Sequence, residues 1–149
     1  MFKRQLSAVA VMTATLLATL LPVQQAAATT YEAREAVRVS AVVLVNNGYY
    51  FNSSATGYLP FRTYALRRLT LYQGVKYAFV GSGCNDAHDV DLVIYDDRGY
   101  RLAYDTTRDK AGVVTMTPTY TGTYFAQIIL TDSTPDGAHY ALTVGTKSR

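Results

Sequence analysis

Cysteine is almost absent from this chain. Cys84 is the only one among 149 residues, which excludes an internal disulfide. In an oxidising compartment a lone cysteine is either a quiet, partly buried thiol or the site of an intermolecular disulfide. We expect the buried thiol, since small apolar packing is the commoner fate of such a residue. A catalytic thiol needs an activating base, and although His88 follows soon after, the acidic residues beside it oppose thiolate formation.

An excess of one charge is lacking as well. The chain carries 14 basic and 11 acidic residues, and two of the basic ones, Lys3 and Arg4, belong to the first 28 residues. Without them the balance is 12 against 11, a net charge of about +1. This balance gives no electrostatic support for a nucleic-acid partner or for attraction to an anionic membrane.

Long apolar runs are missing after residue 28, and the run before it has the features of a secretory signal peptide. Lys3 and Arg4 form a charged start, residues 6–21 are mostly apolar, and alanines at positions 26–28 fit a cleavage site. The alternative is a transmembrane anchor, but serine and threonine interrupt the run, which ends in small residues. We expect cleavage after Ala28, no stable membrane anchor thereafter, and a secreted or periplasmic protein.

The expected mature chain, residues 29–149, is long enough for one domain that buries a core without disulfides. Two parts are expected within it. Residues 29–68 should hold a helix followed by an aromatic linker or edge strands, and residues 69–149 should form a β domain.

Residues 31–46 have the pattern of an amphipathic helix. The apolar residues that recur at three- and four-residue intervals are Ala33, Ala36, Val37, Ala41 and Leu44. Thr29 and Glu32 have the spacing of a capping box at its start, and Gly48 is a typical stop. The β-branched residues near its end leave a strand over residues 41–45 as an alternative.

Residues 48–68 are rich in aromatic side chains, and we expect one or two short edge strands joined by a loop. The aromatic residues are Tyr49, Tyr50, Phe51, Tyr58, Phe61 and Tyr64. Their rings either form a platform on which a sugar or peptide stacks, or pack the helix onto the sheet. We favour the second role, because tyrosine-rich strands more often supply core and rim.

From residue 69 onward, short alternating segments are separated by turn residues. The apolar segments are residues 69–71, 75–79, 90–95, 100–104, 112–116, 123–131 and 139–144. The turns include Gly74, residues 96–99 and residues 133–137. Several short strands at close spacing predict a mainly β fold, an antiparallel β-sandwich or jelly roll with one N-terminal α-helix.

Motifs within these strands resemble those of bacterial pre-peptidase C-terminal (PPC) domains and their stand-alone secreted relatives. The segments are LTLYQGVKYAFVGSG, DVDLVIYDDRG, VVTMTPTYTGTYFAQI and HYALTVG, which together span about the last 75 residues. They contain an Asp-x-Asp-Leu strand from Asp89, a Pro-x-x-x-Gly-x-Tyr turn from Pro118, and a closing Tyr-x-Leu-x-Val from Tyr140. The resemblance implies a sandwich without catalytic activity, of the kind usually appended to secreted peptidases as an accessory or binding module. This chain shows no peptidase.

The loop over residues 81–91, together with a later carboxylate, is the one cluster that suits metal chemistry. If the chain binds calcium, we expect Asp86, Asp89, Asp91 and Asp105 to supply ligands, because calcium prefers several carboxylate oxygens. The alternative, which we favour, is that Asp89 and Asp91 bond backbone amides at strand ends while Asp86 is solvated. The spacing is not that of an EF-hand.

Catalytic constellations are not recognisable. The paired carboxylates lie in predicted turns, and neither histidine has the motif context of a serine triad. We therefore expect no enzyme and no cofactor, but an exported binding or envelope-associated module whose partner is an unknown envelope protein or polysaccharide. The alternative is a calcium-stabilised adhesion domain that binds carbohydrate or protein.

Overall fold

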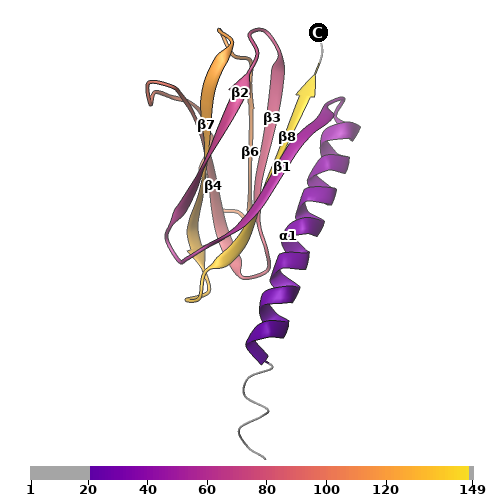
Figure 1. Ribbon diagram of the computed structural model, residues 1–149, viewed down its shortest axis with the longest axis vertical. Helices are drawn as coiled ribbons and strands as arrows, with labels where there is room; N and C mark the ends of the chain where they lie inside the picture. Colours follow the sequence, from indigo (N-terminus) through magenta and orange to yellow (C-terminus); the bar gives the residue numbers. More distant parts are fainter. Residues whose placement is uncertain (1–20, 148–149) are drawn as a thin grey trace, which may run out of the picture.

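A computed structural model describes residues 21–147, with side chains described from residue 30 onward. One helix precedes eight strands. The elements are α1 (Leu21–Asn46), β1 (Tyr50–Leu59), β2 (Tyr64–Leu71), β3 (Lys76–Gly83), β4 (Ala87–Asp96), β5 (Arg101–Asp105), β6 (Ala111–Met116), β7 (Gly122–Ser133) and β8 (Ala138–Lys147). The strands form two packed layers with α1 against one of them (Figure 1).

Each layer is a four-stranded antiparallel sheet. Sheet A has the order β1-β8-β3-β6, and sheet B has the order β2-β7-β4-β5. Only β4 and β5 are consecutive in the chain and also neighbours in a sheet, and each of the remaining strand connections crosses between the layers. The predicted fold class, an antiparallel β-sandwich with one N-terminal α-helix, is confirmed.

The sandwich begins earlier in the chain than the expected boundary at residue 69. β1 pairs with β8 along its length, and β2 runs across the boundary while it pairs with β7. Both are edge strands, as the sequence predicted for residues 48–68. The boundary was misplaced because the aromatic segment lacks clean apolar alternation, and its strand character depends on partners from the far end of the chain.

The predicted turn at residues 96–99 is confirmed, and a buried carboxylate organises it. Asp96 Oδ1 accepts hydrogen bonds from the backbone amides of Arg98, at 3.0 Å, and Tyr100, at 2.8 Å. Gly99 adopts a φ of 83°, a left-handed conformation that favours glycine. This turn reverses the chain between β4 and β5.

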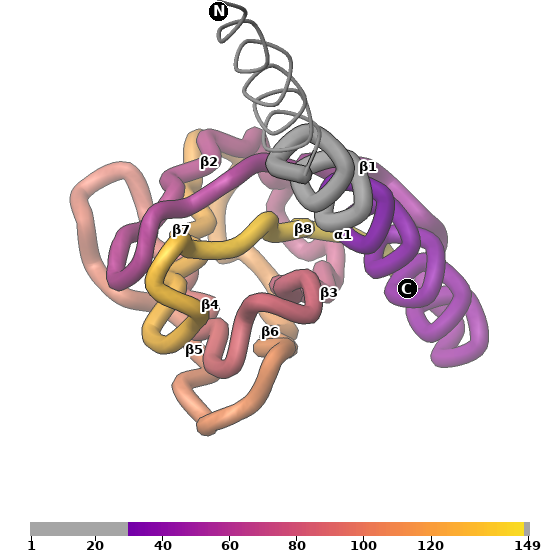
Figure 2. Tube along the Cα trace, turned by 90° about the horizontal axis from the view of Figure 1, so that it is seen from below, coloured from indigo at the N-terminus to yellow at the C-terminus, as the bar shows by residue number. Residues whose placement is uncertain are grey.

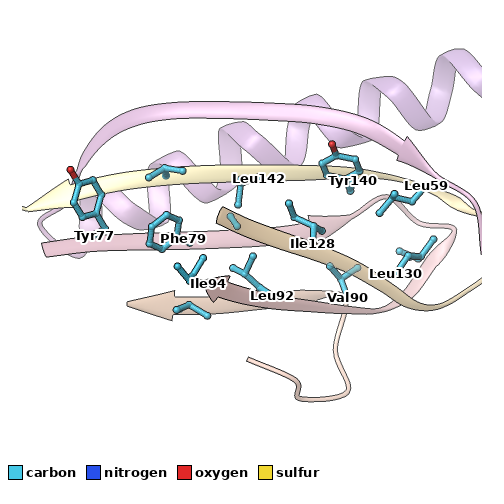
Figure 3. Packing of buried hydrophobic residues seen from close by; sticks show 14 of the residues in the cluster. Leu59, Tyr77, Phe79, Val90, Leu92, Ile94, Ile128, Leu130, Tyr140 and Leu142 are labelled. Atoms are coloured by element: carbon cyan, nitrogen blue, oxygen red, sulfur yellow. The ribbon is translucent and has the colours of Figure 1, made fainter. Parts of the chain in front are cut away.

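The core lies between the two sheets, where inward side chains from both layers meet (Figure 3). Sheet A contributes residues such as Tyr77, Phe79 and Leu142, and sheet B contributes residues such as Leu92 and Ile128. Alternate residues along each strand point inward because successive side chains of a strand lie on opposite faces. The core therefore uses only one face of each sheet and leaves two outer faces to be covered or exposed.

The helix ends where the sequence predicted, and the strand alternative for residues 41–45 is wrong. The Tyr49 amide bonds the Leu44 carbonyl and the Gly48 amide bonds the Val45 carbonyl, both at 2.9 Å, which is the pattern of a Schellman motif. Gly48 has the left-handed φ of 78° that this motif requires. The contact between Tyr49 and Leu44 that usually accompanies it is also present.

The predicted start of the helix is different. α1 begins at Leu21 in the described chain, so it continues through Thr29 rather than starting there. Glu32 therefore lies inside the helix and makes no capping box. Its carboxylate instead accepts hydrogen bonds from the backbone amide of Asn85, at 3.0 Å, and from the Asn85 side-chain amide, at 2.7 Å. The helix is thereby tied to the β3–β4 loop. In the described residues, α1 is not apolar enough over a sufficient length to cross a membrane.

Small side chains on the outer face of sheet A let α1 approach closely. Thr143 and Gly145 on β8 alternate with core residues, and both are buried beneath the helix. A Cβ at Gly145 would lie 3.1 Å from Leu44 Cδ1. The helix buries Ala33, Ser40 and Leu44 in return. Ala41, expected on this face, is only half-buried because Ser40 occupies the central position.

Leu44 should contribute most to the docking of the helix. We expect Leu44→Ala to lower the free energy of unfolding by about 2 to 4 kcal/mol, because it leaves a cavity at a buried contact. Val42→Ala, on the exposed side of the same helix, is the matched control and should change it by less than about 0.5 kcal/mol. Denaturant unfolding measures both. Equal effects of the two substitutions would mean that α1 is not packed on the sheet in solution.

Candidate binding surface

The outer face of sheet B carries large side chains that no other part of the described chain covers. Its members alternate with buried residues along the four strands and form what we call the tyrosine face. They are Tyr64, Leu66 and Arg68 of β2, Phe125, Gln127 and Ile129 of β7, Asp91, Val93 and Tyr95 of β4, and Leu102 and Tyr104 of β5. Figure 2 shows α1 on the opposite side of the sandwich, against β1, β8 and β3.

Strand register places these side chains in rows across the sheet. In the central row Leu66 faces Gln127, Gln127 faces Val93, and Val93 faces Tyr104. Val93 is only 4% exposed although it lies on an outer face, because its larger neighbours surround it. Leu66 and Tyr104, at the ends of the row, are 51% and 55% exposed, and Tyr64 in the next row is 60% exposed. The face is therefore a continuous packed layer with open rings at its borders.

Polar contacts hold several of these side chains in place. The Tyr95 hydroxyl donates to Gln127 Oε1 at 3.0 Å, and Thr131 Oγ1 donates to Asp91 Oδ2 at 2.9 Å. The Arg101 guanidinium lies 4.2 Å from the centre of the Tyr104 ring, a cation–π geometry. Fixed side chains lose less conformational entropy when a partner binds.

The composition of the tyrosine face differs from that of an ordinary protein surface. Monomeric soluble proteins rarely expose contiguous apolar side chains over a wide area, and where they do the patch often binds a partner. Tyrosine and arginine are enriched at such interfaces, whereas lysine and glutamate are depleted. The tyrosine face contains three tyrosines, one arginine and one aspartate, with no lysine or glutamate.

Some aromatic side chains of the segment 48–68 pack the helix onto the sheet, and others are exposed as a platform would require. Tyr49 packs against the helix contact at Leu44. Tyr64 belongs to the tyrosine face, and Tyr50 is 68% exposed on β1. The sequence did not identify the rest of the face on β4, β5 and β7. A signal was present, since the segment YFAQIIL within β7 is apolar in both alternation phases and thus predicts two contacting faces.

The four candidate calcium ligands make separate contacts with different parts of the chain. Asp86 accepts a long contact from the Cys84 thiol, 3.9 Å from Sγ to Oδ2. Asp91 is bonded to Thr131 on the tyrosine face. Asp105 reaches toward sheet A, where Oδ2 accepts the Val113 amide at 2.8 Å. Among residues 30–147 no three histidine, cysteine or acidic side chains form a group that could hold a metal ion.

Asp89 is the acidic residue with the least satisfied surroundings. Its side chain is buried, and Oδ1 has no hydrogen-bond partner in the described chain. Burial raises the pKa of this carboxyl above its usual range, and the nearby charges of Asp91 and Asp132 raise it further. Arg108 and the Asp109 backbone oppose the shift without cancelling it. The negative charge at Asp89 therefore costs stability at neutral pH.

The pKa of Asp105 is shifted in the opposite direction. Burial raises the pKa of its carboxyl, but hydrogen bonds from the Thr107 side chain and from the backbone amides of Val113 and Thr107 outweigh burial and lower it. The Thr107 hydroxyl lies 2.6 Å from Oδ1 and the Thr107 amide lies 3.1 Å from it. Asp105 thus joins β5 to the outer edge of β6 across the two sheets.

Cys84 is buried, as expected, within the core cluster. Its sulfur accepts a hydrogen bond from the His139 backbone amide at 3.3 Å. Its own amide donates to the His139 carbonyl at 2.9 Å. Its low reactivity stays a prediction.

We expect Asp105→Ala to lower the free energy of unfolding by about 1 to 2 kcal/mol at neutral pH, because the amides of Thr107 and Val113 lose a charged acceptor. A carboxyl whose pKa is lowered on folding stabilises the protein above its unfolded pKa, near 3.8, and that stabilisation disappears as the pH falls through the folded value. The difference from the unsubstituted protein should therefore shrink in acid. Denaturant unfolding across this pH range provides the measurement. Asp136→Ala, at an exposed turn, is the control, and an equal loss there would contradict the assignment.

No protein-family model matches this chain, and a search of curated proteins finds no match. Among solved structures, the PPC domain of a collagenase from Bacillus anthracis is similar, with a TM-score of 0.51 and 13% identity over 62% of this chain and 88% of that one. PliG from Aeromonas hydrophila, a periplasmic inhibitor of g-type lysozyme, is similar over 68% of this chain and 90% of that one, with a TM-score of 0.49 and 10% identity. The PPC-like fold that the strand motifs indicated is confirmed.

Proposed function

We propose that this chain is an exported, non-catalytic binding module that recognises a protein or polysaccharide of the cell envelope through the tyrosine face. One observation carries the proposal. Sheet A is covered by α1, whereas sheet B presents an ordered layer of aromatic and aliphatic side chains to solvent. While this layer is exposed to water, the favourable free energy of burying it is not gained. A partner that covers the layer would gain that free energy.

The chemistry of the face suits a partner that presents both apolar surface and hydrogen-bonding groups. Tyrosine offers an apolar ring with a hydroxyl at its tip, so it stacks on flat surfaces while keeping a hydrogen bond. Arg68 lies beside the rings, and the Gln127 side-chain amide lies in the central row. The face has these hydrogen-bonding groups around an apolar centre at Val93.

The expected signal peptide and the PPC-like fold support an exported, accessory role. The positions of the reactive groups support a role without catalysis. Cys84 is buried, the His139 ring lies 3.2 Å from Thr30 Oγ1, and His88 Nδ1 lies 3.8 Å from an Asp132 carboxylate oxygen. These groups contact neighbouring helices and strands, and none belongs to the tyrosine face.

Co-sedimentation with the envelope fraction of the producing organism tests the proposal. We expect the mature chain to be retained, and Tyr64→Ser combined with Tyr104→Ser to reduce retention by about tenfold or more, since aromatic hot spots dominate such interfaces. Protease treatment of the envelope fraction separates the two partner classes. Retention that survives it indicates a polysaccharide, and retention that is lost indicates a protein.

Tyr50→Ser supplies the control for this experiment. Tyr50 is at least as exposed as Tyr64 and Tyr104 but lies on β1 of sheet A. Its substitution should leave retention unchanged. An absence of retention for the unsubstituted chain, or an equal loss in the control, would count against the tyrosine face as the binding surface.

A calcium-stabilised adhesion domain is the second candidate, and one observation favours it. Among the described residues Asp89 Oδ1 has no hydrogen-bond partner, and its burial, together with the charges of Asp91 and Asp132, raises the pKa of this carboxyl. A cation there would relieve the repulsion. Against this, Asp105 is already bonded to β6, and calcium needs more oxygen ligands than Asp89 and Asp91 provide.

Thermal unfolding in millimolar calcium and in chelator decides between the two candidates. We expect no change in Tm. A calcium site at tenfold saturation would add about 1.4 kcal/mol and raise Tm by a few degrees. Asp89→Asn, which removes the costly charge, should raise Tm slightly in both solutions. A calcium-dependent rise that Asp89→Asn abolishes would favour the calcium-stabilised domain instead.

A further inference from the structure

The two sheets have four edge strands, and β1 differs from the other three. Unpaired edges invite additional strands, and proteins usually protect them with charges, proline or covering groups. On β6 the Val113 amide is bonded by the Asp105 carboxylate, and β5 begins and ends with charged residues. β2 carries Arg67 and Arg68. The ten residues of β1, YFNSSATGYL, contain no charge and no proline.

The outer edge of β1 is unpaired along most of a long strand. β8 is the one neighbour with which β1 shares backbone hydrogen bonds in the described chain. The pairing continues without interruption from Ser53, opposite Val144, to Leu59, opposite Ala138. Over this stretch the edge is regular, with the single irregularity confined to its start between Phe51 and Ser53. A second strand could therefore pair with it over several residues.

The segment of the chain that contains β1 has basic residues and no acidic ones. Between Glu35 and Asp86 the chain has no acidic residue. The basic residues in that interval are Arg38, Arg62, Arg67, Arg68 and Lys76. Within the described residues, Arg38 pairs with Glu35 at 2.7 Å, whereas no acidic side chain pairs with Arg62, Arg67 or Arg68. The acidic residues of the chain lie instead in its N-terminal helix and in its second half.

Arginines flank the free edge from both layers. With 3.6 residues per turn, Arg34 lies on the side of α1 roughly opposite Glu32, whereas Arg38 is turned less far and pairs with Glu35. Glu32 bonds Asn85 beyond the end of β3, so Arg34 lies on the β1 side of the helix. From sheet B, the Arg67 Nε lies 3.0 Å from the Tyr140 hydroxyl, and Tyr140 pairs with Gly57 of β1.

We propose that the free edge of β1 binds an extended acidic peptide segment as an added strand of sheet A. Strand addition uses backbone hydrogen bonds for affinity and side-chain contacts for specificity. β1 supplies the unpaired backbone, and Arg34 of α1 together with Arg67 of β2 selects acidic side chains. A second copy of this chain fits less well, because pairing of two β1 edges would bring Arg34 and Arg38 of both copies to the same side.

This site is separate from the tyrosine face, since β1 belongs to sheet A and the face belongs to sheet B. The two proposals can therefore fail independently. The probe is a fluorescent ten-residue peptide that alternates glutamate with valine, compared with a peptide that alternates lysine with valine. Fluorescence anisotropy with the mature chain should show that the glutamate peptide binds at least about tenfold more tightly than the lysine peptide. Its binding should weaken as the salt concentration is raised.

Thr56→Glu places a carboxylate on the exposed face of β1 and should weaken binding of the glutamate peptide by about tenfold. Thr115→Glu makes the same change on β6, at the other edge of sheet A, and should leave binding unaltered. Hydrogen exchange should show new protection of β1 amides when the peptide is bound. A glutamate peptide with N-methyl groups on alternate amides should not bind along its methylated edge, because the methylated amides cannot donate hydrogen bonds to β1.

Four results would overturn the proposal. The first is no binding of the glutamate peptide, and the second is binding without protection of β1. Dimerisation with protected β1 in the absence of peptide would identify a second copy as the occupant. Equal competition by polygalacturonate without protection of β1 would identify an anionic polysaccharide.

Discussion

The packing of α1 on sheet A determines how the rest of the surface is used. A two-layer sandwich has two outer faces, and this chain has one described helix with which to cover them. The helix can approach sheet A because small residues lie beneath it, of which Gly145 makes the closest contact with Leu44. Sheet B offers no such site, since Tyr64 and Tyr104 project from its outer face. Because α1 packs on the outer face of sheet A, the outer face of sheet B stays exposed.

Polar contacts from single side chains complete the arrangement. Glu32 ties the helix to Asn85, and Asp105 ties β5 to the outer edge of β6. These contacts lie toward one side of the sandwich, where β3, β5 and β6 are. The other side, with β1 and β2, has arginines and an uncharged edge strand. The chain therefore has two accessible surfaces of different character, an aromatic face on sheet B and a basic edge on sheet A.

Sequence reasoning succeeded where the information is local and failed where it depends on partners. Gly48 after an apolar period predicted the end of α1, and a Schellman motif confirmed it. Thr29 and Glu32 suggested a cap, yet the helix continues through them, because a capping-box spacing does not by itself end the preceding helix. The sequence grouped Asp91 and Asp105 as candidate calcium ligands, but in the fold Asp91 is bonded by Thr131 and Asp105 by the Val113 amide of the other sheet.

Local patterns were sufficient to predict the strand segments after residue 69, the turns at glycine, the helix end and the PPC-like class, because alternation and turn chemistry act over a few residues. Strand pairing in the folded chain sets which strands are neighbours, which sheet carries the helix and which side chains share a face. Those properties depend on pairings such as β1 with β8, whose residues lie far apart in the chain. No local pattern specifies such a pairing, because its stability comes from a core that both ends of the chain build together.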